Sequence, residues 1–455
     1  MIIKERVNKM AELNFDFSCA RGKIKQMNCL NNGPARRSVR GHSNFEEYKA
    51  LEIPYARNHD AAFFTCYGGE HTVDVHRIFK NFDADENDPA NYIFEPTDNY
   101  TATIFDAGTK VFYRLGATIE HEYKFGTRVP KDFSKWARIA EHIIRHYTEG
   151  WADGFYYDIE YWEIWNEPEV HDPDGTTPCW QGTMDQFTDF FEVVAKHLKK
   201  CFPHLKIGGP SFTTAIKHER FTKFLAAVKD RNIPLDFYSF HGYFSDVRHV
   251  RELSRNAVEQ FEEAGLPQPE LIFNEWNYAR GWMGDVFDYS REQSRKIKGA
   301  SFCAAVMCLG QSSDIDMMMY YDARPSEWCG LFNVYDYRVF KPYYSFAMFR
   351  DVKSLGGHVD AESESGNIFA VASTDGRDGA ILLTHYDDDD GTQPERVTLN
   401  VNKKAGDKGT RVEFYLLDNE HNYELVRAET FDRDSFSLLL EMKLFDTYLV
   451  KLVSL

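Results

Sequence analysis

The chain has 455 residues, of which 43% are hydrophobic and 27% are charged, so it is long enough to bury a large core and too apolar to be disordered. Acidic residues outnumber basic ones by 71 to 53, and the net charge of -18 at pH 7 argues against binding to nucleic acid or to an anionic membrane surface. Aromatic residues make up 15% of the chain, and their ring faces can pack a core or stack against a ring-shaped ligand.

The amino-terminal sequence MIIKERVNKM has charges inside every short apolar run, and the chain has no run of 18 apolar residues. We therefore expect neither a secretory signal nor a membrane span. The cysteines are scattered, with no Cys-x-x-Cys pair and no His-rich neighbour, at positions 19, 29, 66, 179, 201, 303, 308 and 329. This usage is typical of reduced, mostly buried thiols, so we expect a cytoplasmic protein without a structural zinc site.

Short apolar runs alternate along most of the chain with longer segments of helical period. Ser43 with Glu46 and Thr183 with Gln186 have the spacing of a capping box, so each pair predicts the start of a helix. Gly150 follows an apolar repeat of three and four residues and predicts the end of another. Strands are predicted at residues 25–29, 53–57, 111–115, 159–165, 205–208, 237–240, 271–274 and 315–320.

Eight such strand and helix units within residues 23–355 predict an α/β fold, namely a (β/α)8 or TIM barrel. An open doubly wound sheet fits less well, because no glycine-rich dinucleotide loop follows the first predicted strand. In a (β/α)8 barrel the functional side chains lie at the carboxyl ends of the strands, which the βα loops surround. Candidate site residues are therefore sought directly after the predicted strands.

The carboxy-terminal residues 356–455 have a different texture, with short alternating apolar runs such as residues 397–401. This alternation predicts an accessory β-sandwich domain. A similar alternation at residues 13–17 predicts that the amino-terminal segment 1–22 joins the sandwich. The acidic run 387–390 is interpreted as a solvated hairpin turn and not as a calcium loop, because the ligand spacing of a calcium loop is absent.

Two glutamates stand where a predicted strand meets a loop. Glu167 follows the fourth strand in the sequence Ile-Trp-Asn-Glu-Pro, and Glu275 follows the seventh in Phe-Asn-Glu-Trp-Asn. A carboxylate directly after a buried apolar run is costly unless it is paired, hydrogen-bonded or functional. The fourth and seventh strands lie across a barrel from each other, so these carboxyl groups can face one bound sugar ring. Glycoside hydrolysis needs one carboxyl group to protonate the leaving oxygen and another to attack carbon or to activate water.

The segments at residues 165–168 (Trp-Asn-Glu-Pro) and 273–276 (Phe-Asn-Glu-Trp) resemble the acid/base and nucleophile motifs of retaining glycosidases with a (β/α)8 barrel. Within that clan the chain is most similar to glycoside hydrolase family 39, which contains β-xylosidases and α-L-iduronidases. The similarity covers residues 23–355. Further matching segments are Asn-Asn-Gly-Pro at 31–34, Arg-Asn-His-Asp at 57–60, Phe-His-Gly-Tyr at 240–243 and Lys-Pro-Tyr-Tyr at 341–344.

The resemblance implies a role for each matching residue. Glu167 would be the general acid/base and Glu275 the nucleophile, with Arg57 supporting Glu275 from below and helping to keep it ionised. Asn166 would bind the hydroxyl next to the reacting carbon, and Tyr243 would hold the Glu275 carboxylate in its attacking orientation. The other substrate-binding residues that we predict are His59, His241, Trp276, Trp282, Asp322, Glu327 and Trp328.

The protonation states follow from the proposed roles. Glu167 must begin protonated near neutral pH, which requires that burial and the neighbouring negative charge of Glu275 raise its pKa. Once a covalent intermediate removes the charge of Glu275, Glu167 should lose its proton more easily and act as a base toward water.

The resemblance implies a retaining exo-glycosidase that uses no cofactor and no metal and whose partner is a small oligosaccharide or glycoside. A β-D-xylosidase is the favoured reading. Galactosides, glucosides, arabinosides and iduronides stay open as substrates, because selectivity depends on a few pocket side chains. A catalytically silent carbohydrate-binding protein is the alternative from another class, and a homo-oligomer is left open.

Overall fold

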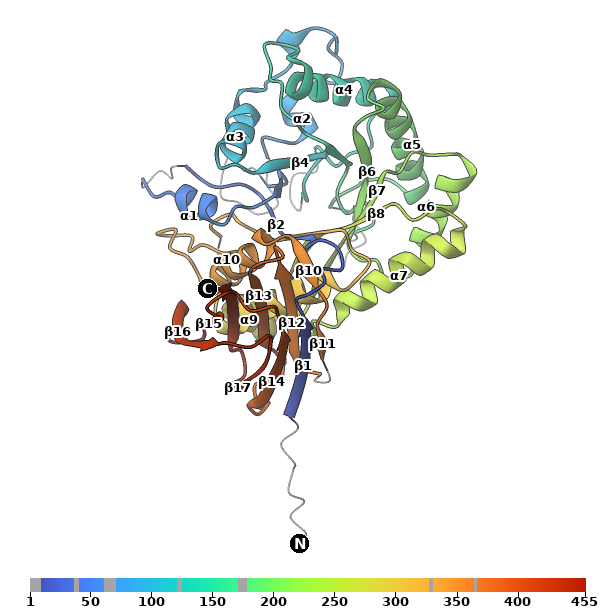
Figure 1. Cartoon of the computed structure of the whole chain (residues 1–455). Coiled ribbons are helices and arrows are strands. Elements are labelled where there is room, and N and C mark those ends of the chain that lie inside the picture. The colour runs from blue at the N-terminus through green and yellow to red at the C-terminus, as the bar shows by residue number, and fades with distance from the viewer. Residues whose placement is uncertain are drawn as a thin grey trace.

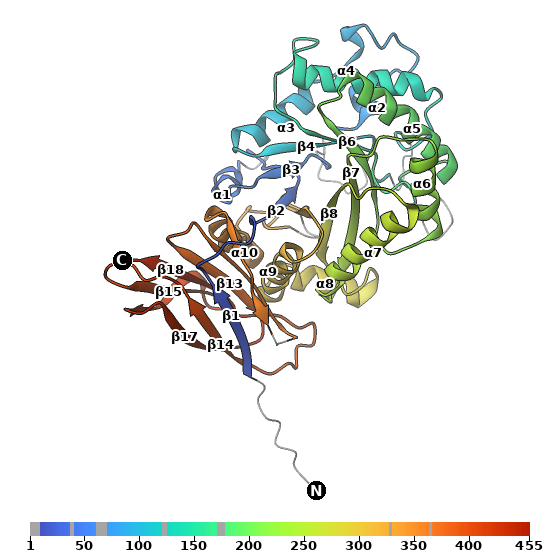
Figure 2. The same cartoon turned by 45° about the vertical axis from the view of Figure 1, so that its right-hand side comes forward.

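The computed structural model describes residues 10–36, 41–60, 71–120, 125–170, 178–326, 330–363 and 366–455. The described chain forms a closed barrel ringed by helices and, beside it, a second part made of strands (Figures 1 and 2). None of its described helices is long and apolar enough to cross a membrane.

The barrel is a closed ring of parallel strands in sequence order, which confirms the predicted (β/α)8 fold. Part of its interior is filled by apolar side chains from several strands, including Phe112, Tyr161, Phe237 and Met317, so it is a packed core and not a pore. The strands are β2 (Gln26–Asn31), β3 (Tyr55–Arg57), β4 (Lys110–Leu115), β5 (Tyr161–Ile164), β6 (Lys206–Phe212), β7 (Phe237–Phe244), β8 (Glu270–Tyr278) and β9 (Met317–Tyr320).

Helices surround the barrel and close its apolar outer layer. They are α1 (Phe45–Ala50), α2 (Val75–Ile78), α3 (Glu95–Asp106), α4 (Phe133–Glu149), α5 (Met184–Cys201), α6 (Glu219–Asp230), α7 (His249–Ala264), α8 (Gly284–Gln293), α9 (Ile297–Gln311) and α10 (Lys341–Ser354), with a short 3-10 helix at Pro89–Asn91.

Two of the three predicted helix signals are confirmed. Thr183 and Gln186 form a reciprocal capping box at the start of α5, and Gly150 ends α4 in the left-handed conformation. The predicted N-cap at Ser43 is one residue early, because α1 begins at Phe45 and its N-cap is Asn44. The side-chain oxygen of Asn44 accepts a hydrogen bond from the Ala35 amide, so a tertiary contact and not a capping box fixes this helix start.

The strand-rich part is a sandwich of two sheets, in the orders β11-β1-β14-β17 and β10-β12-β13-β18-β15-β16. The strand expected at residues 13–17 is β1, and it runs parallel to β14, so the chain crosses this sandwich once before it enters the barrel. Alternate apolar residues of both sheets form the sandwich core. The strands are β1 (Met10–Asp16), β10 (Gly357–Val359), β11 (Glu362–Ser363), β12 (Ile368–Thr374), β13 (Gly379–His385), β14 (Glu395–Asn402), β15 (Thr410–Leu417), β16 (Asn422–Phe431), β17 (Ser435–Met442) and β18 (Thr447–Ser454).

Helices α9 and α10 lie between the barrel and the larger sheet and pack against β12 and β13 (Figure 2). At the edge of this seam, the acidic run after β13 contacts the barrel. Arg280 donates to Asp388 at 2.9 Å, and Lys298 donates to Asp390 at 2.9 Å. Both aspartates are thus paired with cations of the barrel. The predicted solvated turn is wrong for Asp388, whose side chain is only 24% exposed, whereas Asp390 is both paired and solvated, with its side chain 58% exposed.

Candidate active site

The backbone leaves regular strand geometry where it presents the two predicted catalytic glutamates. Glu167 lies just beyond β5 with a φ of 46°, and its amide donates to the Ser211 carbonyl at 2.9 Å. On β8, the pairing with β7 shifts so that Phe273 and Glu275 oppose consecutive residues of β7, which leaves Asn274 as a bulge. The bulge allows Asn274 and Glu275, although consecutive, both to reach the polar network inside the barrel. Irregular backbone thus aims both glutamates into the mouth of the barrel.

The structure brings Glu167 and Glu275 together. One carboxylate oxygen of each lies within 4.8 Å of the other and of a ring nitrogen of His241. Both residues are largely removed from solvent, with side chains 16% and 7% exposed. The two groups can therefore act on the same substrate atom or on atoms one bond apart.

Glu275 is held by contacts to both of its oxygens. Arg57 donates to Oε1 at 2.7 Å, and Tyr243 donates to Oε2 at 2.8 Å. These contacts fix the orientation of the carboxylate, as the resemblance implies for Arg57 and Tyr243. Burial nevertheless raises the pKa of Glu275 above its ordinary value, although the charge of Arg57 opposes this. The expected support from Arg57 is present, but it does not outweigh burial.

Glu167 faces a neutral partner. Its Oε1 lies 2.6 Å from Nδ1 of His241, and burial raises the pKa of Glu167 to about 7, with Asp60 adding a like charge. Burial also lowers the pKa of His241 to about 4, so that ring carries no charge near neutral pH. Glu167 is thus a carboxyl group poised to be protonated, as its predicted role requires, although Asp60 and not Glu275 is the like charge that contributes most.

The hydrogen bonds around His241 assign its tautomer. Ser211 Oγ accepts from Arg57 at 3.0 Å and from Asn274 at 3.4 Å, which fills both of its acceptor positions, so its single proton is directed at Nε2 of His241, 2.6 Å away. Nε2 then accepts, and Nδ1 carries the proton that it donates to Oε1 of Glu167. With Oε1 acting as an acceptor, the acidic proton of Glu167 resides on Oε2, the oxygen turned away from His241.

Two predicted substrate-binding residues lie beside the catalytic pair. The side-chain oxygen of Asn166 accepts from Arg57 at 2.8 Å, so its amide nitrogen is the group able to donate to a sugar hydroxyl. His59 places Nε2 3.5 Å from Oε1 of Glu275, while its Nδ1 accepts from Arg114 at 3.2 Å. Burial lowers the pKa of His59 well below its ordinary value, so it is a neutral donor at this position.

The predicted substrate-binding role of Trp276 is wrong. It is fully buried and packs its ring against Phe302 of α9, Tyr320 of β9 and Phe346 of α10. Side chains alternate along a strand, so when Glu275 points into the barrel its neighbour points toward the helices. Trp276 therefore belongs to the layer outside the barrel and does not line a sugar pocket.

The other predicted aromatic and acidic residues have mixed outcomes. Trp282 is half-exposed at the rim, where its ring meets Tyr243 edge-on at 5.2 Å. Asp322 is buried, accepts from Asn32 at 2.8 Å and lies near Arg324, and burial raises the pKa of Asp322 to about 7. Contacts of Trp282 and Asp322 with sugar stay predictions. Glu327 and Trp328 lie outside the described residues.

Sequence reasoning missed Glu163, which sits on β5 below the catalytic pair. It is fully buried and accepts from Arg57 at 2.7 Å, from Ser239 at 2.6 Å and from Asn274 at 2.6 Å. It therefore shares the guanidinium of Arg57 with Glu275 and sets how much positive charge Glu275 receives. The sequence did contain a signal for a buried ion pair, because a glutamate inside the apolar run Tyr-Trp-Glu-Ile requires a buried cation.

The arrangement can donate a proton from one carboxyl group and attack with another. Glu167, His241 and Glu275 also converge as metal ligands would. However, the guanidinium of Arg57 already supplies a positive charge 2.7 Å from Glu275. The same network thus accounts for these three residues without a metal ion.

Comparisons with known proteins give the family and the folds to which this chain is similar. The family model described as "Glycosyl hydrolases family 39" matches residues 60–264, a range that contains Glu167 but ends before Glu275. A beta-xylosidase from Geobacillus stearothermophilus is 27% identical over 161 residues, which are 35% of this chain and 29% of the relative. A beta-xylosidase from Caldicellulosiruptor saccharolyticus is 26% identical over 216 residues, 41% of each chain. The matched segments thus span less than half the length of either relative.

Solved structures share the fold over nearly the whole chain. A glucosidase from Croceicoccus marinus matches with a TM-score of 0.79 at 20% identity, covering 98% of this chain and 100% of that one. A monomeric beta-xylosidase from Caulobacter crescentus CB15 matches with a TM-score of 0.72 at 17% identity, covering 98% and 99% of the two chains. At these identities the likeness establishes the arrangement of barrel and sandwich.

Proposed function

We propose that the chain is a retaining glycosidase of glycoside hydrolase family 39, with Glu167 as acid/base and Glu275 as nucleophile. The family-model match over residues 60–264 and the two beta-xylosidase relatives support the family. The observation that carries the proposal is the approach of the two carboxyl groups, just beyond β5 and on β8, each of which places one oxygen within 4.8 Å of the other. Retaining enzymes hold these groups about 5–5.5 Å apart, whereas inverting enzymes leave about 6.5–9.5 Å for a water molecule.

In the first step, an oxygen of Glu275 attacks the anomeric carbon as the bond to the leaving oxygen breaks. Glu167 transfers its proton to that oxygen, so the leaving group departs neutral and Glu167 becomes a carboxylate. Tyr243 and Arg57 hold the attacking carboxylate, which limits the rotation that would otherwise misalign it. Asn166 is placed to donate to the hydroxyl beside the reacting carbon, a bond that strengthens as positive charge develops on the ring.

In the second step, water attacks the same carbon from the side the leaving group vacated. Glu167 accepts its proton, the ester bond to Glu275 breaks, and the starting configuration is restored. The ester carries no charge, so Glu167 no longer has an anionic neighbour at Glu275 during this step. The fall in its pKa suits it to act as a base.

We favour a β-D-xylosidase that removes terminal xylose from short oligosaccharides or simple glycosides. The two sequence relatives described as beta-xylosidases support the choice of sugar. The cytoplasmic location expected from the sequence would supply short, imported substrates. Glucosides, galactosides, arabinosides and iduronides are the competing sugars, because a few pocket side chains decide among them.

A panel of aryl glycosides tests activity, sugar and anomer together, with Glu275→Gln as the matched control. We expect the highest kcat/KM on the β-xyloside, β-xylose as the first product seen by NMR, and no turnover by the control. Release of α-xylose from that substrate would contradict retention. Binding of sugars without any turnover would instead indicate a silent carbohydrate-binding protein.

A further inference from the structure

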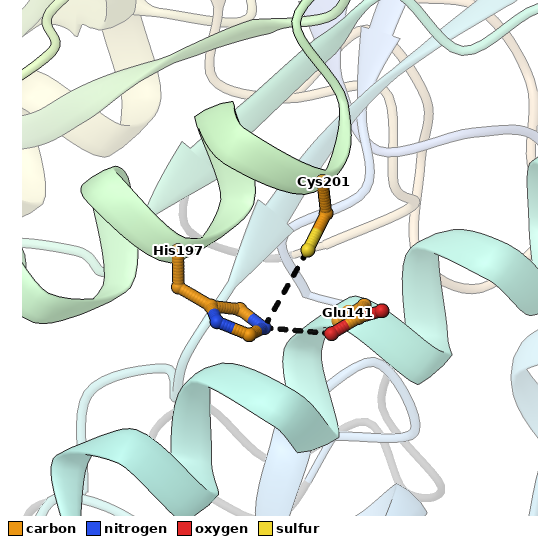
Figure 3. A group of neighbouring side chains, drawn as sticks. All are labelled: Glu141, His197 and Cys201. Atoms are coloured by element: carbon orange, nitrogen blue, oxygen red, sulfur yellow. Dashed lines mark hydrogen bonds and ion pairs between the residues drawn. The ribbon is translucent and has the colours of Figure 1, made fainter.

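A second cluster of reactive side chains lies on the outside of the barrel, between α4 and α5. His197 and Cys201 are four residues apart on α5 and so project from the same face of that helix. Glu141 projects toward them from α4 (Figure 3). None of the three touches the catalytic carboxyl groups, and the glycosidase mechanism does not use them.

The three potential ligand atoms converge on one point. Nε2 of His197 lies 2.7 Å from Oε2 of Glu141 and 3.8 Å from Sγ of Cys201, and all three atoms lie within 4.8 Å of one another (Figure 3). From typical zinc bond lengths, tetrahedral ligands would be separated by about 3.4–3.6 Å. Side-chain shifts of roughly 1 Å or less would bring the three atoms to those separations.

We propose that Glu141, His197 and Cys201 form a Zn²⁺ site that ties α4 to α5. A thiolate, an imidazole and a carboxylate are the donors that zinc prefers, whereas calcium and magnesium favour oxygen ligands alone. The side chains of Glu141 and His197 are 16% and 29% exposed, so solvent has access and a water molecule can complete four ligands.

The charges around the cluster suit a divalent cation. The thiolate and the carboxylate together carry two negative charges, which balance the two positive charges of Zn²⁺. Arg145 donates to the other oxygen of Glu141 at 2.8 Å and orients Oε2 toward His197. The positive charge of Arg145 is itself offset by an ion pair with Glu149, so it does not leave an unbalanced cation beside the site.

The position in the fold indicates what a bound ion would do. Helix α4 precedes β5 and α5 follows it, and β5 is the strand that leads to Asn166 and Glu167. A zinc ion joining these helices would stabilise the frame around this strand without entering the chemistry. Zinc should therefore raise the melting temperature and leave kcat unchanged.

Cobalt titration of the chelator-treated full-length protein tests the site, because a cobalt–thiolate bond gives a charge-transfer band that the catalytic trio, which has no sulfur, cannot produce. We expect one Co²⁺ per chain, full displacement by Zn²⁺, and loss of the band in Cys201→Ser. Cys19→Ser is the matched control, since Cys19 is an exposed free cysteine elsewhere in the structure, and it should keep the band.

Two further variants keep the test decisive if Cys201→Ser does not fold. His197→Asn and Glu141→Gln should each weaken zinc binding by about tenfold or more and abolish the zinc-dependent rise in melting temperature of several degrees. Absence of stoichiometric binding at micromolar zinc would overturn the proposal. So would a cobalt–thiolate band that survives in Cys201→Ser.

Discussion

Carboxylates gather around cations at two places in the molecule, the mouth of the barrel and its seam with the sandwich. At the mouth, Glu163 and Glu275 divide the single guanidinium of Arg57, and burial raises the pKa of both Glu275 and Glu167. At the seam, two aspartates meet two cations. Burial alone would raise the pKa of Asp388, but hydrogen bonds from Arg280, Tyr278 and Lys298 hold it below its ordinary value.

The two sites differ in whether hydrogen bonds and nearby cations outweigh the effect of burial on the carboxyl pKa, which they do at Asp388 and do not at Glu275 and Glu167. Asp390 behaves in the same way as Asp388, because hydrogen bonds from Lys298 and Tyr289 lower its pKa against the effect of burial. At the seam the charges are matched and join two parts of the chain. At the mouth burial outweighs the single guanidinium, and with the like charge of Asp60 it raises the pKa of Glu167 to about 7, which suits the proposed acid role.

The largest effect is expected from Glu275→Ala. Loss of the proposed nucleophile should lower kcat by about 10⁴-fold or more on every substrate, because Glu275 is the carboxylate that Arg57 and Tyr243 orient for attack. Added azide should restore part of the turnover and yield a glycosyl azide of inverted configuration, which NMR identifies. Full activity in this variant would remove Glu275 from the mechanism.

Glu167→Ala should discriminate between leaving groups. Substrates with poor leaving groups should lose about 10²–10⁴-fold in kcat/KM, whereas a dinitrophenyl glycoside, which needs no proton, should lose much less. The comparison is made on one sugar with a series of phenols of graded acidity. Equal losses across the series would argue against an acid role for Glu167.

Arg57→Gln and Arg280→Gln compare the two regions directly. Arg57 is fully buried between two carboxylates, so its loss should lower the free energy of unfolding by about 3–5 kcal/mol. Arg280 is 36% exposed, and solvent screening should limit its loss to about 1 kcal/mol or less. Urea unfolding measures both, with Arg57→Lys as a milder partner variant. Equal losses in the free energy of unfolding would mean that the buried ion pairs of Arg57 stabilise the fold no more than the exposed pair of Arg280 does.

The pH profile of kcat/KM sharpens the contrast. Activity requires protonated Glu167, whose pKa is about 7, so the rate should fall as pH rises through about 7. Activity also requires ionised Glu275, whose raised pKa places the acidic limb above that of an ordinary glutamate. In Glu167→Gln, assayed with the dinitrophenyl glycoside, the basic limb should disappear while the acidic limb stays. A basic limb that persists would assign it to another group.

Asp388→Asn should have the smallest effect. The variant weakens the bonds from Arg280 and Tyr278 at the root of the loop that carries Trp282, so we expect a change in KM of a few-fold with kcat nearly constant. Because the pKa of Asp388 is lowered on folding, its stabilising contribution is present above the ordinary aspartate pKa and is lost as pH falls through the folded value. Asp389→Asn is the neighbouring control.

Much of the fold was predictable because it rests on local patterns. All eight barrel strands coincide with short apolar runs, and the capping box at Thr183 and the stop at Gly150 need only residues nearby in sequence. Motifs placed Glu167, Glu275 and Arg57 in one site. Trp276 was misplaced because a motif does not say which neighbour of a catalytic residue points outward.

What escaped prediction depends on contacts between distant residues. Glu163 and Arg57 are 106 positions apart, and only a closed barrel makes them a pair. The acidic run at the seam was interpreted as solvated because its cations come from a segment about a hundred residues earlier. The proposed site at Glu141, His197 and Cys201 has no signal in the spacing of the cysteines, because its glutamate lies on another helix. The expected absence of a metal stays a prediction.

Trapping of the covalent intermediate tests the central claim most directly. A 2-deoxy-2-fluoro-β-xyloside with a good leaving group should form a stable ester, and mass spectrometry of peptides should place one sugar on Glu275. Loss of labelling in Glu275→Gln, with Glu167→Ala still labelled, is the pattern that the account predicts. A sugar attached to Glu167, or rapid hydrolysis of an unfluorinated substrate with no ester formed at Glu275, would contradict it.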